Sequence, residues 1–171
     1  TTAEQHDVVL TREAQYRQAL ADDRAFHKRF MTLPFEVPDA AFRKTAATLA
    51  GDEGVNTSTP EGLAKLKPVL ADGTVTFGGQ THPADGNAGI IVALPERARE
   101  LSANPKIRIT LHGFGSARVP VAFMPEAPAP AARHALSVAD MRIDQMDAIK
   151  THNPFAVNDV LFSREMGVPI D

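Results

Sequence analysis

The sequence predicts a layered α/β fold, because strand and helix patterns alternate along its second half. Three apolar or alternating segments carry the strand prediction, at residues 88–95, 106–114 and 147–153, and each precedes a helical pattern. The chain has 171 residues, of which 43% are hydrophobic and 23% charged. This composition is typical of one ordinary folded domain and excludes a disordered tail.

The first half is predicted to begin as a helix and to become irregular. Residues 11–30 are rich in Ala, Arg, Gln and Leu, which favours a helix, and residues 30–38 follow as a short extended segment. Residues 39–60 are polar and contain Gly, Asn and Pro, which indicates a loop. A Thr-Pro-Glu capping pattern at residues 59–61 predicts a short helix that ends at Pro68.

A turn-rich stretch separates these elements from the alternating second half. Residues 72–89 hold several glycines, which indicates a close approach of the backbone to another strand or to a ligand. Three further helices are predicted, two beginning near Pro95 and Pro130 and a third ending at Gly167. We expect this last helix to carry an apolar face that no following strand covers, formed by Val157, Val160, Leu161 and Met166.

Composition excludes several classes of protein. The formal net charge of −3 argues against a nucleic-acid partner, because a domain that binds nucleic acid normally carries an excess of basic residues. The chain has no cysteine, which excludes a disulfide scaffold, a cysteine-ligated zinc and a cysteine nucleophile within these residues. No apolar run reaches the ~18–20 residues of a membrane helix, and no signal-peptide pattern opens the sequence. We therefore predict a cytoplasmic protein without a membrane span.

The histidines are the first candidates for chemistry. No pair among the six has the i, i+4 spacing of a helical metal site, so no metal site is predicted. His152 follows a predicted strand and precedes a helix, at the strand end where α/β folds place ligands. His82 lies beside Pro83 in the glycine-rich stretch. For both residues, the alternative is a loop histidine that makes local hydrogen bonds.

The Gly-Phe-Gly-Ser sequence at residues 113–116 resembles a phosphate-binding loop. It lacks the third glycine and the Lys-Ser/Thr pair of such loops. We therefore favour a turn or a strand bend here, and Asp85-Gly86 is likewise interpreted as a turn.

Four stretches of the chain have a distinctive pattern. They are LAKLKPVLADGTVT at 63–76, GGQTHPADG at 78–86, MPEAPAPAARHAL at 124–136 and IDQMDAIKTHNPFA at 143–156. In order and spacing they resemble the thiolase family. They are similar, in turn, to its helix leading into a Gly-Thr-Val-Thr strand, its Gly-Asn-Ala-Ser turn, its Met-x-x-x-Pro-x-Pro-Ala segment and its Asn/His-x-x-Phe-Ala motif. The resemblance covers about residues 8–171.

The resemblance implies a layered α/β fold of two similar halves, of which this chain supplies a part. Residues 1–72 would be a helix and loop-domain segment, and residues 73–171 an incomplete C-terminal domain. The implied reaction is acyl transfer between coenzyme A thioesters, by Claisen condensation or thiolytic cleavage, with acyl-CoA and CoA as partners and no cofactor. The departures from the family pattern imply a divergent branch, nearer the sterol-carrier-type thiolases; they are Phe77, Gly79, His82, Pro83, Asn153 and Pro154.

Two cysteines and a Gly-His-Pro histidine carry catalysis in the family, and the chain matches none of them. The resemblance therefore implies a middle section of a thiolase that needs the remaining thiolase segments as partners. We expect the isolated chain to be inactive and to form a homo-oligomer through exposed sheet edges and apolar surface. The alternative function is a non-catalytic half-subunit or acyl-CoA-binding module that completes a partner's site.

Five residues are the candidate site residues, by their match to family motifs. His152 matches the Asn or His that holds a water against the thioester oxygen, and is the catalytic candidate. Thr81 matches the turn serine that meets the pantetheine arm, and His82 replaces a small residue and offers a polar contact. Met124 and Phe155 match positions that line the acyl or pantetheine tunnel. For these last two, plain core residues are the alternative.

Overall fold

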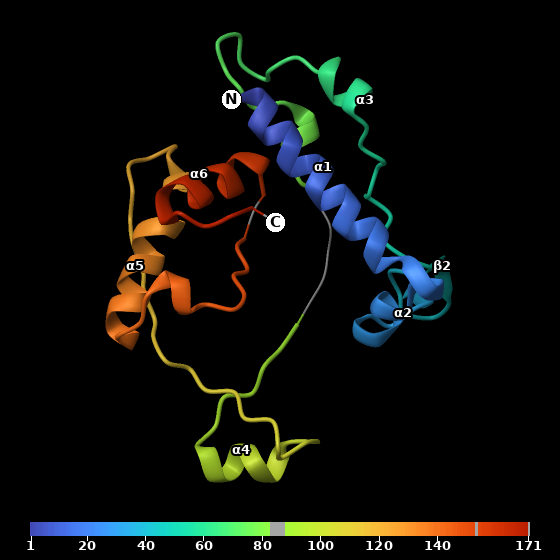
Figure 1. The fold of residues 1–171 in the computed structure, drawn as a ribbon. Helices are drawn as coiled ribbons and strands as arrows, with labels where there is room; N and C mark the ends of the chain where they lie inside the picture. The colour runs from blue at the N-terminus through green and yellow to red at the C-terminus, as the bar shows by residue number, and fades with distance from the viewer. Residues whose placement is uncertain (83–87, 153, 171) are drawn as a thin grey trace. The chain divides into compact units, whose positions relative to one another are not determined.

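The chain forms two compact units in the computed structural model, which describes residues 1–82, 88–152 and 154–170 (Figure 1). The first unit comprises residues 1–83 and 151–171, and the second comprises residues 84–150. The expectations that concern Pro83, Asp85-Gly86 and Asn153 lie outside the described residues.

Two helices open the first unit where one was predicted. Helix α1, blue in Figure 1, spans Thr2–Ala19, and α2 spans Ala21–Phe30. The start of α1 lies well before residue 11 because Thr1 and Glu4 form a capping box, in which the Thr1 hydroxyl accepts from the Glu4 N–H. Three residues near the start of α2, Asp22 to Arg24, have positive φ. Aspartate tolerates this backbone region better than most residues, and these residues interrupt the predicted helix.

A two-stranded hairpin follows the helices. Strand β1, Phe35–Pro38, confirms the predicted extended segment and pairs antiparallel with β2, Thr45–Leu49. In the turn between them, the Asp39 carboxylate accepts from the N–H groups of Ala41 and Arg43. The prediction of a loop throughout residues 39–60 is therefore wrong at β2. The sequence of β2, Thr-Ala-Ala-Thr-Leu, shows no alternation of apolar and polar residues, and the strand is mostly exposed.

Helix α3, Pro60–Ala64, and helix α6, Ala156–Met166, complete the first unit, with a 3₁₀ turn at Phe77–Gly79. Thr59 caps α3 as predicted, and Gly167 ends α6 in the left-handed conformation at φ +66°. Val160 of α6 is buried against Val8 of α1. The expectation of an uncovered apolar face on the last helix is therefore wrong at Val160, since α1 covers it.

The second unit is built from short helices. They are α4, Pro95–Leu101, and α5, Pro128–Ala139, with 3₁₀ turns at Met124–Glu126 and Ile143–Gln145. Both α-helices begin with proline in the first turn, as predicted, because proline needs no N–H partner there.

The three predicted strands do not form within the described residues. Residues 88–94, 106–114 and 147–152 belong to no strand, and Ile90 and Ile109 are 84% and 88% exposed. A strand pattern becomes a strand only when a neighbouring strand satisfies its N–H and C=O groups. The alternation of apolar residues in these segments is real, but the chain itself supplies no strand to pair with them in its described part.

The Gly-Phe-Gly-Ser segment packs against a helix. A Cβ added to Gly115 would overlap the carbonyl oxygen of Ala131 and lie 2.5 Å from the Ala135 nitrogen. A Cβ on Gly113 would lie 2.6 Å from the Ala135 carbonyl oxygen. These glycines therefore allow the segment to approach the backbone of α5.

We expect Gly115→Ala to destabilise the second unit by about 1–3 kcal/mol, because the added methyl meets backbone atoms that cannot move aside. Gly89→Ala is the matched control, since nothing lies within 4 Å of a Cβ at that position. Amide hydrogen exchange of α5 measures the effect. Equal protection of α5 in both variants would contradict this account of Gly115.

Candidate functional site

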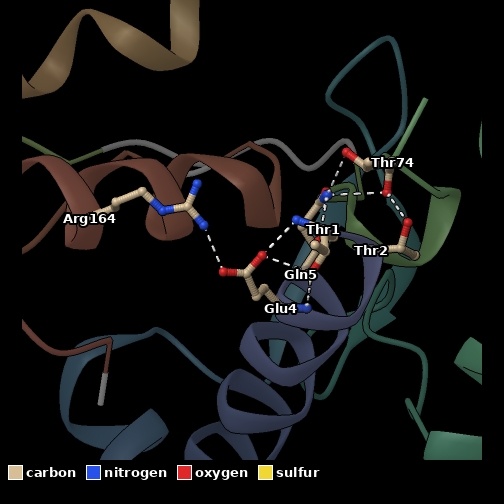
Figure 2. Close-up of polar contacts among 6 residues, drawn as sticks. All are labelled: Thr1, Thr2, Glu4, Gln5, Thr74 and Arg164. Carbon is tan, nitrogen blue, oxygen red and sulfur yellow. Dashed lines mark hydrogen bonds and ion pairs between the residues drawn. The ribbon is translucent and has the colours of Figure 1, made fainter. Parts of the chain in front are cut away.

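Helix α1 holds the glycine-rich segment in place. The Gln5 side-chain nitrogen donates to the carbonyl and hydroxyl oxygens of Thr74, both at 3.1 Å, and the Thr2 hydroxyl donates to the same carbonyl at 2.9 Å (Figure 2). Gln5 and Thr76 are each only 2% exposed. The segment that leads to Thr81 is therefore attached to α1 through polar contacts, of which those of Gln5 are partly buried.

The same end of α1 contacts α6. The Glu4 carboxylate accepts from the Thr1 ammonium and from Arg164 of α6, at 2.6 and 2.7 Å (Figure 2). The pKa of Glu4 is lowered to about 2. The hydrogen bond from the Thr1 ammonium is the main cause, and hydrogen bonds from the Thr1 hydroxyl and from Arg164 add to it. Glu4 thus stays ionised at neutral pH and able to pair with Arg164.

A second ion pair joins the middle of α1 to α6 and is largely buried. Arg12 donates through Nε and one terminal nitrogen to Asp159 Oδ2, at 3.1 and 2.8 Å. The Asp159 side chain is 5% exposed and that of Arg12 is 39% exposed. The Thr151 hydroxyl donates to the other carboxylate oxygen, Asp159 Oδ1, at 3.0 Å. This network links α1, α6 and the residue directly before His152.

A backbone contact brings two distant motifs together. The Thr81 N–H donates to the carbonyl oxygen of Pro154 at 2.8 Å, and Gln80 and Phe155 form an antiparallel bridge. The glycine-rich segment therefore lies beside the segment that begins α6. Four of the five predicted site residues belong to these two segments, namely Thr81, His82, His152 and Phe155. The first three are exposed and Phe155 is half-buried.

Gly79 lies beside both helices of this region. A Cβ on Gly79 would make ordinary contacts with the Ala156 methyl at 3.6 Å and the Gln5 side-chain oxygen at 3.8 Å. Gly79 therefore lies between α1 and the start of α6. His82 has a different neighbour, since a Cβ on Gly54 would overlap the imidazole ring. The ring of His82 thus packs against the loop before α3.

Met124 belongs to the second unit. It lies in the 3₁₀ turn before α5 and is 52% exposed. Its assignment to a substrate tunnel stays a prediction, as does that of Phe155.

Sequence reasoning missed Arg12, Thr151 and Asp159. Arg12 and Asp159 are 147 positions apart, so no local pattern connects them. The available signal was weak, because a charged residue in an amphipathic helix is most often solvent-exposed. Asp159 is instead one of the buried polar residues of the unit.

The described residues contain neither a helix suited to a bilayer nor a cluster of metal-binding side chains. None of the described helices has the length and apolar character needed to cross a bilayer. Within residues 1–82, 88–152 and 154–170, no three or more His, Cys, Asp or Glu side chains are grouped so as to hold a metal ion.

The chain is similar to several known proteins over part of their length. It is 35% identical over 117 residues to the acetyl-CoA acetyltransferase of Syntrophomonas wolfei, covering 68% of this chain and 29% of that protein. It is 31% identical over 161 residues to the peroxisomal 3-ketoacyl-CoA thiolase B of Mus musculus, covering 92% of this chain and 38% of that protein. No family model matches the chain.

A solved structure gives the same result for the fold. The crystal structure of the Bacillus anthracis acetyl-CoA acetyltransferase matches 99% of this chain with a TM-score of 0.80 and 26% identity, and 41% of that chain is covered. The predicted fold class, a partial layered α/β fold of thiolase type, is thereby confirmed. The chain belongs to the thiolase family and spans less than half the length of these relatives.

Proposed function

We propose that the chain is part of a thiolase-like acyltransferase that acts on acyl-CoA thioesters, by Claisen condensation or thiolytic cleavage. The observation that carries the proposal is the hydrogen bond between the Thr81 N–H and the Pro154 carbonyl, which joins two of the four thiolase-like stretches of the chain. It sets the turn of Thr81 and His82 beside the segment of His152 and Phe155. Membership in the thiolase family supports the acyl-CoA substrate.

His152 is the proposed catalytic residue. Attack on a thioester carbonyl places negative charge on its oxygen, and a fixed N–H donor, direct or through a water, stabilises that charge. The imidazole supplies such a donor in its neutral form. Its exposed position, four residues before the first residue of α6, leaves it accessible to a substrate.

The remaining site residues have binding roles in this proposal. The hydroxyl of Thr81 pairs with an amide of the pantetheine arm, and His82 adds a polar contact beside it. Met124 and Phe155 line the tunnel for the arm or for the acyl chain. The exposure of Thr81 and His82 supports these roles, because neither side chain is buried within the chain.

The wider assignments are proposals on the same basis. The partners are acyl-CoA, CoA and the thiolase segments that carry the two cysteines and the Gly-His-Pro histidine, and the complete protein is a homo-oligomer. The only cofactor-like group is the CoA of the substrate. The domain boundary at residues 72–73, the sterol-carrier-type branch and the cytoplasmic location stay predictions. One of the relatives is named as peroxisomal, so relatives differ in location.

The test compares the 171-residue chain with a protein that joins it to those remaining segments, called the complete enzyme below. We expect the complete enzyme to cleave acetoacetyl-CoA in the presence of CoA, and the isolated chain to show no turnover, since it has no thiol to attack a thioester. Loss of the thioester absorbance measures both.

Two outcomes would contradict the proposal. Turnover by the isolated chain would show that catalysis does not need a cysteine. An inactive complete enzyme that still binds acyl-CoA would favour the alternative function, a non-catalytic module that binds acyl-CoA or completes a partner's site.

A further inference from the structure

We infer that Thr151 and Asp159 are positioning residues for His152, and that Arg12 holds the Asp159 carboxylate in the orientation that accepts the Thr151 hydroxyl. This inference rests on the proposed function, in which His152 is the oxyanion donor. Thr151 directly precedes His152 in the chain, and the Thr151 hydroxyl donates to the buried carboxylate of Asp159 on α6.

Asp159 is held by several donors. Its Oδ2 accepts two hydrogen bonds from Arg12, and its Oδ1 accepts one from Thr151 at 3.0 Å. Arg12 is itself fixed by a further bond to the Ile170 carbonyl oxygen at 3.0 Å. The carboxylate is therefore anchored to α1 and to the chain after α6, independently of Thr151.

His152 lies between two anchored residues. On one side, the Thr151 side chain is attached to Asp159. On the other, the Pro154 carbonyl oxygen accepts from Thr81. The structure gives the exposed side chain of His152 no hydrogen bond or ion pair of its own among the described residues. Its direction is thus set by the backbone on either side of it.

The hydroxyl of Thr151 is the specific requirement. Threonine and valine have nearly the same shape, but valine has no group that donates to a carboxylate. In Thr151→Val, the first anchor is lost while Asp159 keeps both hydrogen bonds from Arg12. The loop then samples more orientations of His152, which reduces the fraction of bound substrate that meets a correctly placed donor.

The test is steady-state kinetics of the complete enzyme with acetoacetyl-CoA and CoA. We expect Thr151→Val to lower kcat about 10-fold with KM nearly unchanged, which is within the ~10²-fold that a 1 Å misplacement can cost. Thr151→Ser restores the donor and should recover most of kcat. Thr11→Val is the matched control, since that hydroxyl donates only to the Asp7 carbonyl of its own helix.

A double-substitution cycle separates positioning from a general loss of stability. If Thr151 acts through His152, Thr151→Val should have no further effect on kcat in a His152→Ala background. A 10-fold loss in both backgrounds, or no loss in either, would overturn the inference while leaving the proposed function intact. If the wild-type complete enzyme has no activity, the proposed function itself fails, so the two failures are distinguishable.

Discussion

His152→Ala should lower the kcat of the complete enzyme by roughly 10²–10³, the loss expected when one oxyanion donor is removed. The effect should fall mainly on kcat and only weakly on KM, because the donor stabilises charge that develops in the transition state. The imidazole is exposed and makes no hydrogen bond or ion pair with the described residues, so the variant should fold normally. Far-UV circular dichroism checks the fold and steady-state kinetics measures the loss.

His152→Asn is the informative partner variant. A carboxamide N–H₂ can hold the same water as the imidazole N–H, so much of the activity should remain. If His152 only braces its loop, both variants should change stability while kcat per folded molecule stays within about threefold of wild type. That pattern would require withdrawal of the catalytic role.

Arg12→Ala should destabilise the first unit by about 3–5 kcal/mol, the cost of leaving a buried charge without its partner. The asymmetry of the pair makes the prediction specific. The Asp159 side chain is only 5% exposed, whereas that of Arg12 is 39% exposed. Asp159→Ala should therefore cost less, since the freed guanidinium can turn toward solvent. Chemical denaturation measures both variants.

A surface lysine of the same unit is the control. Lys28 of α2 pairs with Asp23, and their side chains are 51% and 92% exposed. Such an exposed pair contributes only about 0.2–1 kcal/mol, so Lys28→Ala should be nearly neutral. Equal losses from Arg12→Ala and Lys28→Ala would show that the buried position of Asp159 does not matter.

Local sequence features were enough to predict most helices and the family. The proline starts of α3, α4 and α5 and the glycine end of α6 follow from the backbone restrictions of these two residues, which act within one turn. The thiolase resemblance likewise rested on short motifs whose order is visible in the sequence. The interruption of the first predicted helix was missed, because it depends on three consecutive residues of positive φ, and two neighbouring aspartates alone do not predict such a run.

The arrangement of the site was decided by tertiary structure. The sequence named Thr81 and His152 separately, and only the hydrogen bond from Thr81 to Pro154 shows that their segments lie side by side. The burial of Asp159, and its pairing with Arg12, depends on α1 packing across α6, which no periodicity within either helix reveals. The absence of the three predicted strands from the described residues was also decided by tertiary structure. A strand requires hydrogen-bond partners from another segment, so residues such as Ile90 and Ile109 keep a strand pattern in the sequence yet stay exposed where no partner strand lies beside them.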